Sequence, residues 1–216
     1  GGTGYIGSHC AVRLLEKNFQ VVLLDNLSNS CVSVSEKIQE ISKKQLAFIE
    51  GDINDEQILK KIFSSHNIDL VFHCAGLKAV TESVRYPSKY NQNNVIGSKC
   101  LIETMASSGV CKLIFSSSAT VYGEPAYLPM DEKHPINPLH PYGKNKVAIE
   151  KILKDKANAD PAWKVICLRY FNPIGAHKTN LIGESPTGHP NNLLPYIMQV
   201  AAKKKSKLEI FGNDYS

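Results

Sequence analysis

Residues 1–7 read Gly-Gly-Thr-Gly-Tyr-Ile-Gly, and residues 20–25 read Gln-Val-Val-Leu-Leu-Asp. Glycines spaced three apart let backbone N–H groups approach a pyrophosphate at the N-terminus of a helix, and the apolar spacing predicts that helix over residues 5–17. The apolar run is typical of a parallel strand covered on both faces. It ends at Asp25, about 20 residues after the glycines, where a carboxylate accepts hydrogen bonds from the adenosine ribose. A carboxylate repels a 2′-phosphate, so the stretch predicts a dinucleotide-binding fold that prefers NAD to NADP. A plain glycine turn followed by a helix-capping aspartate is the competing interpretation, which this spacing disfavours.

Apolar runs and helical segments continue to alternate after Asp25. Strands are expected over residues 46–50, 69–76, 112–115 and 164–169, and helices over 87–109, 142–158 and up to residue 65 from a cap at Asn54 or Asp55. This alternation predicts a doubly wound parallel α/β sheet of the Rossmann type. Beyond the strand ends, Asp52 is expected to reach the adenine, and Lys78 a phosphate or ribose. His73 lies inside an apolar run and is interpreted as a hydrogen-bonded core histidine.

Both ends of the sequence are expected to be truncated. The glycine turn has no strand before it, and residues 212–216 fall in an expected loop. We therefore expect residues 1–171 to form an NAD-binding Rossmann domain without its first strand, and residues 172–216 to begin a smaller substrate-binding domain. The second part should contain a helix over 192–204 and a short strand over 208–211. Loss of a central strand should exceed the ~5–15 kcal/mol by which domains are stable, so such a fragment is expected to fold poorly.

The composition is that of an ordinary globular protein, with 43% hydrophobic and 21% charged residues among 216. No apolar run reaches the roughly 18 residues of a membrane span, and no leader for secretion is recognised. Six cysteines without a C-x-x-C pair are interpreted as small buried hydrophobes of a reducing, cytoplasmic compartment. The formal charge of +5 comes mostly from lysine, and the dense cluster over residues 203–207 is expected to cap a helix. Basic residues are not interleaved with aromatics, so nucleic-acid binding is disfavoured, and no metal site is expected.

Tyr142 and Lys146 stand four residues apart at the start of a predicted helix, so both side chains can reach one ligand. A phenol ionises near pH 10, and about 4 kcal/mol opposes its use as a base at pH 7. An ammonium group about 4–5 Å away at an effective dielectric near 20 supplies ~3–4 kcal/mol, so Lys146 should lower the pKa of Tyr142. The serine run 116–118 ends the preceding strand, where open α/β sheets bind ligands. A chance pair on a solvated helix and a hydrated strand end are the competing interpretations.

Several stretches support these interpretations when they are taken together: GGTGYIGSH, LLDNLSNS, AGLKAV, FSSSATVYG, PYGKNK, RYFNPIGAH and NNLLPYI. With them the chain resembles the extended short-chain dehydrogenase/reductases, and within these the UDP-galactose 4-epimerase family. The resemblance covers the chain from end to end. It implies reversible interconversion of UDP-galactose and UDP-glucose by inversion at sugar C4, through a transient 4-keto sugar and tightly bound NAD. Because NAD is regenerated in each turnover, no second substrate would be needed.

The resemblance also implies roles for particular residues. Tyr142 would take the O4 proton, Ser118 would hydrogen-bond O4, and Lys146 would bind the nicotinamide ribose. The implied contacts with the cofactor are Gly1, Gly4, Tyr5, Ile6, Gly7, Asp25, Asn26, Asn29, Ser30, Asp52, Ile53, Cys74, Ala75, Gly76, Leu77, Lys78, Asn93, Tyr142, Lys146 and Phe171. The implied contacts with the UDP-sugar are Lys78, Ser118, Ala119, Thr120, Tyr142, Asn172, Asn192, Leu193 and Phe211.

Other activities of the same superfamily were weighed against this one. Nucleotide-sugar dehydratases carry an Asp-Glu pair after the serine or threonine, whereas this chain has Ala119 and Thr120, which cannot titrate, so dehydration is disfavoured. Another NAD-dependent epimerase, such as a UDP-uronate 4-epimerase, stays open. A non-catalytic NAD-binding sensor is the alternative from a different class, but such proteins tend to lose the Tyr-Lys pair. The residues do not decide whether N-acetylated sugars are accepted or whether the protein is a homodimer.

Overall fold

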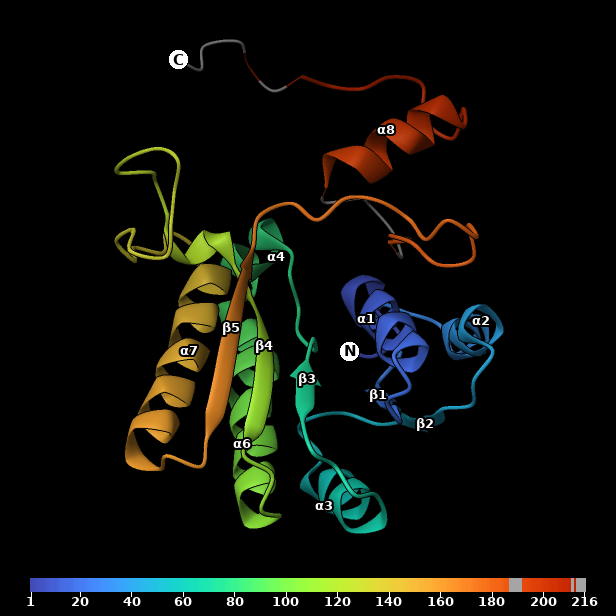
Figure 1. The fold of residues 1–216 in the computed structure, drawn as a ribbon. Coiled ribbons are helices and arrows are strands. Elements are labelled where there is room, and N and C mark those ends of the chain that lie inside the picture. Colours follow the sequence, from blue (N-terminus) through green and yellow to red (C-terminus); the bar gives the residue numbers. More distant parts are fainter. Residues whose placement is uncertain (187–191, 211, 213–216) are drawn as a thin grey trace.

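The structure of the chain is a computed structural model that describes residues 1–186, 192–210 and 212. The strands are β1 (Val22–Asp25), β2 (Ala47–Glu50), β3 (Val71–His73), β4 (Lys112–Ser118) and β5 (Lys164–Tyr170). The helices are α1 (Tyr5–Glu16), α2 (Ser33–Ser42), α3 (Glu56–Ser65), α4 (Val80–Arg85), α5 (Pro87–Tyr90), α6 (Gly97–Ser107), α7 (Pro141–Ala159) and α8 (Leu193–Ala201), with a π-helical segment η1 (Asn91–Ile96) and a 3₁₀ segment η2 (Ala119–Val121). Figure 1 shows α6 and α7 beside β4 and β5, and α1 and α2 beside β1 and β2.

All strand pairs in the described residues are parallel, in the orders β1-β2 and β3-β4-β5. The glycine turn lies between the two groups of strands. Gly2 N donates to Leu24 O at 3.1 Å on one side, and a Cβ atom on Gly1 would come within 2.4 Å of Ala75 N on the other. The chain first places β1 and β2 on one side of this turn and then crosses to place β3, β4 and β5 on the other side. This is the arrangement of a doubly wound sheet. The predicted fold class is confirmed.

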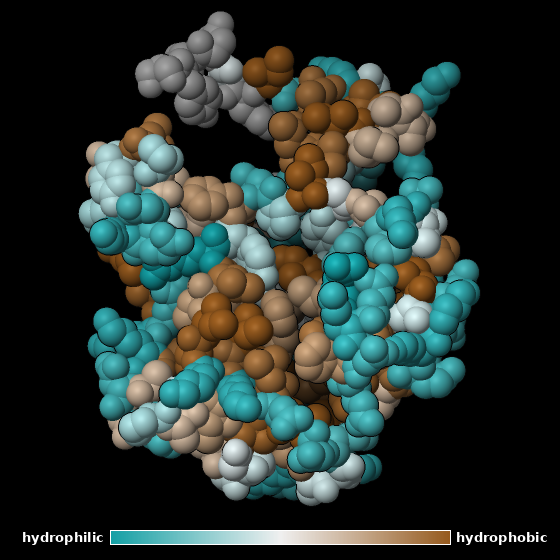
Figure 2. Space-filling model, in the orientation of Figure 1, coloured by the Kyte–Doolittle hydropathy of each residue, from teal (hydrophilic) through white to brown (hydrophobic). Residues whose placement is uncertain are grey.

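Each group of strands has its own apolar core. The larger core joins α6, β4 and α7 through Leu101, Ile102, Met105, Leu113, Phe115, Ile149 and Leu153. The smaller core joins α1, β1 and α2 through Ala11, Val12, Leu15, Leu23 and Ile38. The outer face of β5 is less covered than its other face. Ile166 on this strand is 55% exposed, and Figure 2 shows hydrophobic residues on the surface over this part of the molecule. The cores hold the carboxyl ends of β1, β3 and β4 in place.

Local signals set several helix boundaries as expected. Asp55, and not Asn54, caps α3, since its side chain accepts from Gln57 N and Ile58 N. Pro141 is the first residue of α7, and Pro87 the first of α5, where a missing N–H costs nothing. His73 is buried and its Nε2 hydrogen-bonds Ser98 Oγ at 2.8 Å, so the interpretation as a core histidine is confirmed.

Several expectations were wrong in detail. The strand expected over 69–76 shortens to β3, and α4 was not expected. The helix expected over 87–109 is interrupted by the π-helical η1, which shifts its register. Residues 208–210 form no strand, because no other described strand pairs with them, and residue 211 lies outside the described residues. Helix α8 ends at Ala201, short of residue 204.

The cysteines were expected to be buried, which was wrong for Cys31, whose residue is exposed, while the other five are half-buried. Each of the six is a free thiol. In the described part of the chain, no helix has the length and apolar character to cross a membrane.

Candidate active site

A cavity of about 620 Å³ opens where β3, β4 and β5 end, against the first turn of α1. The carboxyl ends of parallel strands beside a reversal of strand order form the usual ligand site of a doubly wound sheet. Many residues singled out from the sequence line it: Gly1, Gly4, Tyr5, Ile6, Gly7, Asn29, Ser30, Cys74, Gly76, Lys78, Ser118, Thr120, Tyr142, Lys146, Phe171, Asn172 and Asn192. The fold thus brings most of the predicted site together.

The glycine turn leaves no room for a side chain at Gly1, Gly2 or Gly7. A Cβ atom on Gly7 would come within 2.2 Å of Gly1 O, and that distance is too short for any real contact. Helix α1 starts directly after Gly4, with no side-chain cap and no acidic residue in its first turn. A helix N-terminus that no side chain caps attracts anions. The turn therefore fits the pyrophosphate of a dinucleotide.

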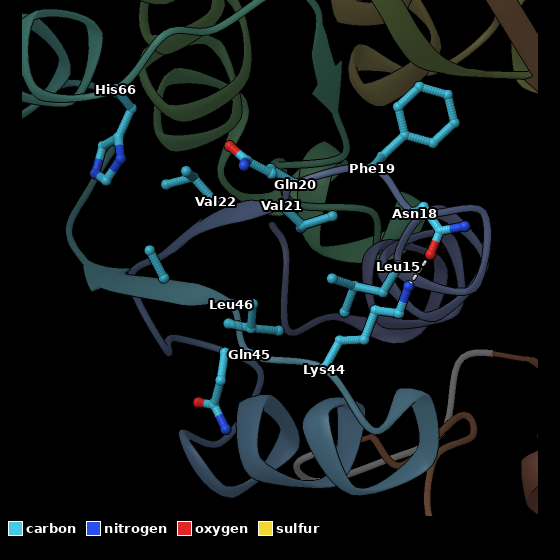
Figure 3. Close-up of a pocket in the computed structure, with 11 residues that line it drawn as sticks. Leu15, Asn18, Phe19, Gln20, Val21, Val22, Lys44, Gln45, Leu46 and His66 are labelled. Carbon is cyan, nitrogen blue, oxygen red and sulfur yellow. Dashed lines mark hydrogen bonds between the residues drawn. The ribbon is translucent and has the colours of Figure 1, made fainter.

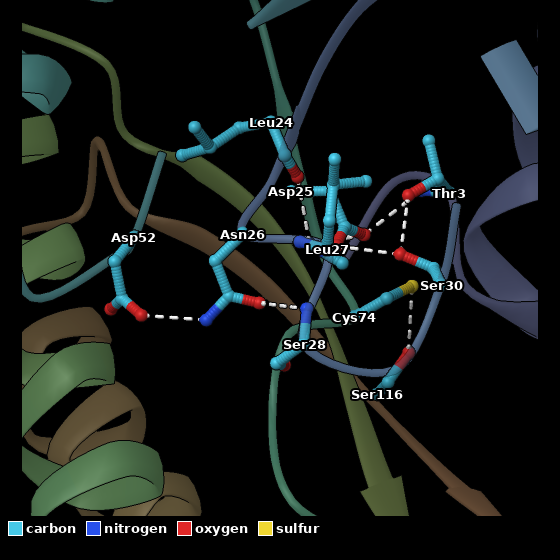
Figure 4. Close-up of polar contacts among 11 residues, drawn as sticks. Thr3, Leu24, Asp25, Asn26, Leu27, Ser28, Ser30, Asp52, Cys74 and Ser116 are labelled. Carbon is cyan, nitrogen blue, oxygen red and sulfur yellow. Dashed lines mark hydrogen bonds and ion pairs between the residues drawn. The ribbon is translucent and has the colours of Figure 1, made fainter. Parts of the chain in front are cut away.

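Asp25 is buried and does not line the cavity, and it ties the glycine turn to the next loop (Figure 4). Its carboxylate accepts from Thr3 N at 3.0 Å, from Leu27 N at 2.9 Å and from Ser30 Oγ at 2.9 Å. The N-terminal ammonium of Gly1 also lies 3.5 Å from this carboxylate, which offers about four acceptor sites in all. The ribose contact of Asp25 stays a prediction. The structure also gives Asp25 a structural role, which is to hold the glycine turn.

A second acidic residue stands further along the same edge. Asn26 Nδ2 donates to Asp52 Oδ2 at 2.6 Å, beyond the end of β1 (Figure 4). Asp52 also accepts from Asn54 N at 2.8 Å. The adenine contact proposed for Asp52 remains a prediction, because Asn26 and Asp52 do not line the cavity.

Ser118, Tyr142 and Lys146 converge at the buried end of the cavity. Lys146 Nζ donates to Ser116 O at 2.7 Å and lies 4.7 Å from the centre of the Phe115 ring and 5.7 Å from that of Tyr142. Tyr142 N donates to Ser83 Oγ at 3.2 Å, which fixes the start of α7. Ser118 Oγ accepts from Thr120 Oγ1 at 2.9 Å. The three side chains are placed by core elements and not by loops.

Burial sets the protonation of this group. Burial raises the pKa of Tyr142, and its hydrogen bond with Ser118 opposes part of that rise. Burial lowers the pKa of Lys146 to about 8, although Cys74 and Glu150 favour the ammonium form. The ammonium is directed at the Ser116 carbonyl, and the pKa of Tyr142 is set by burial and by Ser118. That Lys146 lowers the pKa of Tyr142 stays a prediction.

The outer end of the cavity, at Lys78 and Asn192, is held by polar contacts that the sequence did not reveal. Glu184 Oε1 accepts from Lys78 Nζ at 2.9 Å and from Asn192 Nδ2 at 2.6 Å. Tyr5 donates through its hydroxyl to Gly175 O at 2.7 Å. Leu193 is 66% exposed and does not line the cavity, and Phe211 lies outside the described residues.

Asn94, the neighbour of the predicted Asn93, makes the closer connection to the site. Its Oδ1 accepts from Leu77 N at 2.8 Å, and its Nδ2 donates to Leu77 O at 3.0 Å, so it clamps the loop that leads to Lys78. The register shift in η1 turns Asn94 inward and leaves Asn93 half-buried outside the lining. Other predicted residues also lie outside the lining: Ile53, Ala75, Leu77 and Ala119. Their contacts with ligands remain predictions.

Besides Asn94, three residues near the site were missed from the sequence: Glu150, Arg169 and Glu184. Glu150 follows Lys146 by one more helical turn, and this spacing could have singled it out. The carbonyl of Ser116 and the pairing of Arg169 depend on strand register, which no local pattern reveals. No sequence signal points to Glu184.

A second cavity, of about 460 Å³, lies at the opposite, amino ends of β1 and β2 (Figure 3). Its lining is largely apolar or amide, with Phe19, Val21 and Leu46 among it, and Lys44 bonds Asn18 at its rim. Its titratable residues, Lys44 and His66, lie on opposite sides of the pocket and do not converge (Figure 3). We therefore assign the chemistry to the cavity at the carboxyl ends.

Comparison with known proteins agrees with this geometry. The NAD dependent epimerase/dehydratase family matches residues 1–215. The chain belongs to this family. It is 55% identical over 216 residues to a UDP-glucose 4-epimerase of Neisseria meningitidis serogroup C, covering all of this chain and 64% of that protein. The chain thus spans somewhat less than two thirds of the length of this curated relative.

Solved structures of such epimerases share the fold. One is the UDP-glucose 4-epimerase from Bifidobacterium longum in complex with NAD+ and UDP, with a TM-score of 0.96 at 43% identity, covering 99% of this chain and 64% of that one. Another is the enzyme from Stenotrophomonas maltophila with bound NAD and formylated UDP-arabinopyranose, with a TM-score of 0.97 at 44% identity, covering 100% and 64%. The resemblance inferred from the motifs is confirmed.

Proposed function

We propose that the protein interconverts UDP-galactose and UDP-glucose by inversion at sugar C4, with NAD as a tightly bound cofactor and a 4-keto sugar as a transient intermediate. One observation carries this proposal: Ser118, Tyr142 and Lys146 converge, buried, beside a glycine turn that has space only for backbone. The similarity to epimerases whose structures hold NAD supports it.

The residues of this chain divide the work as follows. NAD, when bound, would supply a hydride acceptor and donor for sugar C4 and a positively charged ring beside the phenol. A positive charge next to a buried phenol lowers its pKa, so Tyr142 can take the O4 proton and later return it. Ser118 hydrogen-bonds Tyr142, and its hydroxyl would also hydrogen-bond O4. Lys146, anchored on Ser116 O, presents its charge to the nicotinamide ribose and to Tyr142.

The cofactor would lie along the glycine turn, with its ribose at Asp25. Gly1, Gly4 and Gly7 would let the backbone approach the pyrophosphate, and the first turn of α1 would provide the N–H groups. Asp25 disfavours a 2′-phosphate on that ribose because both are anionic. These features favour NAD over NADP.

The sugar nucleotide would occupy the outer end of the cavity, at Lys78, Asn172 and Asn192. We place the start of the substrate-binding part at residue 172, directly after β5 and Phe171. Ala119, Leu193 and Phe211 keep their proposed substrate contacts as predictions.

We also propose a homodimer in the cytoplasm. Val84, Tyr86 and Ile96 are 57%, 46% and 41% exposed on α4, its end and η1, and a contact between copies would bury them. Sedimentation velocity of the natural full-length protein tests this. The parent should sediment as a dimer, and a Val84→Asp variant should shift it toward a monomer. A parent protein that sediments as a monomer contradicts the proposal.

The activity is tested by offering UDP-galactose to the natural full-length protein without added cofactor. UDP-glucose should form, and denaturation should release NAD. UDP-glucuronate offered in parallel should not be epimerised. If the protein turns over UDP-glucuronate in preference to UDP-galactose, the UDP-uronate 4-epimerase alternative is favoured. Bound NAD without turnover of either sugar nucleotide would favour the sensor and overturn the proposal.

A further inference from the structure

Behind the reacting side chains, a polar network joins three elements of the core. Glu150 lies on α7, one turn beyond Lys146, and its carboxylate accepts from Ser117 Oγ on β4. The same carboxylate accepts from Arg169 Nε at 3.0 Å and from Arg169 Nη2 at 2.7 Å on β5. Arg169 Nη1 donates to Tyr122 OH at 3.1 Å, just past η2. The side chains of Glu150 and Arg169 are only 11% and 19% exposed.

The network contacts the site at Ser117, between the two serines that touch Lys146 and Tyr142. Ser117 is the middle residue of the run in which Ser116 O holds the Lys146 ammonium and Ser118 carries the hydroxyl beside Tyr142. A tie at Ser117 therefore fixes both neighbours at once. Because Glu150 and Lys146 share one helix, the tie sets the distance between the end of β4 and the reacting face of α7.

Stability alone does not explain this arrangement. A buried ion pair gives little net stability compared with apolar residues of the same volume, because two charges must leave water. A bidentate arginine–carboxylate contact does, however, give precise geometry. The network is better suited to placing groups than to strengthening the core.

We propose that Glu150 is a positioning residue, which holds Ser118 and Lys146 in their reactive arrangement by tying α7 to Ser117 and Arg169. This inference rests on the proposed function for its kinetic test. The negative charge of Glu150 also acts on Lys146, in addition to the hydrogen bonds that Glu150 forms.

The electrostatic environment of Lys146 makes that charge measurable. The titratable groups that face the ammonium are Glu150 and Tyr142 on its own helix, His73 on β3, and Cys74 after β3. Burial lowers the pKa of Lys146 to about 8, while Cys74 and Glu150 act in the other direction. His73 stays neutral, because burial lowers its pKa to about 3. Glu150 is therefore the one carboxylate in this set of described groups, and removing its charge should move the Lys146 titration to lower pH.

The test compares Glu150→Gln, Glu150→Asp and Ser117→Ala in the natural full-length protein. Glu56→Gln is the control, because Glu56 forms an exposed pair with Lys60 at 2.7 Å on α3, remote from the network. Two readouts are taken for each variant. One is kcat for UDP-galactose against pH, per folded enzyme. The other is the Lys146 titration, followed by NMR in protein made with ¹³C-labelled lysine and assigned by its absence in Lys146→Ala.

Glu150→Gln should lower kcat about 10–100-fold, the scale of loss that a small misplacement of reacting groups produces. Its Lys146 titration and the alkaline limb of its pH profile should both move to lower pH. Glu150→Asp should keep the titration near that of the parent. Ser117→Ala keeps the charges of Glu150 and Arg169 paired. It should lower kcat several-fold without moving the alkaline limb of the pH profile. Glu56→Gln should match the parent in both readouts.

Either of two results overturns the inference: a Lys146 titration that does not move in Glu150→Gln, or a kcat per folded enzyme that does not change in Glu150→Gln and Ser117→Ala. A lower Tm with unchanged kcat belongs to this second result and leaves Glu150 a purely structural residue. The Lys146 titration needs no turnover. If the parent protein fails to interconvert the sugars, the proposed function falls, and the titration still decides whether Glu150 acts on Lys146.

Discussion

At one end of the cavity the proposed reacting groups are buried, and at the other end the proposed substrate contacts are exposed. Ser118, Tyr142 and Lys146 are between 5% and 9% exposed. At the outer end Asn172 is exposed, the Lys78 side chain is 48% exposed and Asn192 is half-buried. The buried groups stand on β4 and α7, whereas Asn172 follows the last strand and Asn192 precedes α8.

This difference has a physical consequence for each end. A buried phenol and a buried ammonium have shifted pKa values, so small changes around them alter the chemistry. Polar groups near solvent are screened and exchange their partners with water, so each contributes modestly to binding. Substitutions at the buried end should therefore change kcat, and substitutions at the exposed end should change KM. The predictions below test that division, from the largest expected effect to the smallest.

Tyr142→Phe should give the largest loss. The substitution removes the proton acceptor but keeps the ring that packs at the start of α7. General acid–base catalysis contributes about 10²–10⁴-fold, so kcat should fall by at least that factor while NAD retention changes little. Steady-state turnover of UDP-galactose and the NAD released on denaturation measure the two effects.

Tyr127→Phe is the matched control, because the Tyr127 hydroxyl donates to Asp131 in an exposed loop outside the cavity lining. It should leave kcat unchanged. Near-parental turnover in Tyr142→Phe would remove Tyr142 from the mechanism and, with it, the division between the two ends.

Lys146→Ala should lower kcat about 10–100-fold, equivalent to one or two pKa units of the phenol. The pKa that governs activity should move upward, because a positive charge beside the phenol is lost, and higher pH should recover part of the rate. In the parent, the ammonium loses its proton as pH rises through about 8, so an alkaline limb is expected there and should be absent from the variant. NAD retention should also weaken.

The double variant of Tyr142 and Lys146 sharpens this prediction. Both substitutions act through one phenolate, so their effects on kcat should not add. A pH profile for Lys146→Ala that falls without shifting would leave the lysine as a cofactor contact only.

Asp25→Ala should weaken NAD binding about tenfold and narrow the preference over NADP, because the ribose hydroxyls lose a charged acceptor worth roughly 1.5–3 kcal/mol at most. Thr3 N and Leu27 N also lose their acceptor, so Tm should fall. Asp55→Ala is a suitable control. It too removes a carboxylate that accepts from two backbone N–H groups, at the start of α3, and it should lower Tm without changing cofactor preference. If the parent binds NADP as tightly as NAD, the assignment of Asp25 is wrong.

The outcome of the sequence analysis shows the same division. Gly1–Gly7, Asp25 and the pair Tyr142 and Lys146 were found from the sequence because each depends on local spacing along one strand or helix. Asn94 was missed in favour of Asn93, because a π-helical register shift leaves no simple pattern. The Ser117–Glu150–Arg169 network was missed because Ser117 and Arg169 face each other only through the register of β4 against β5, and the packing of α7 brings Glu150 to both. The strand expected over 208–211 had a suitable apolar pattern, but a strand also needs a partner, and local pattern carries no information about one.

Asn192→Ala should give the smallest effect, and it tests the exposed end directly. Asn192 Nδ2 and Lys78 Nζ both donate to Glu184 Oε1, so a carboxylate at present holds two of the groups proposed to meet the sugar nucleotide. A ligand at this end must displace that contact, and the net gain from one neutral hydrogen bond is about 0.5–1.5 kcal/mol. KM for UDP-galactose should accordingly rise about 2- to 10-fold in Asn192→Ala, with kcat within a factor of two of the parent. Glu184→Gln should do the opposite and lower KM, because it weakens the hold on Lys78 without removing a proposed ligand contact. If Asn192→Ala instead lowers kcat as strongly as Lys146→Ala, the exposed end takes part in placing the reacting groups, and the two ends of the cavity act as one unit.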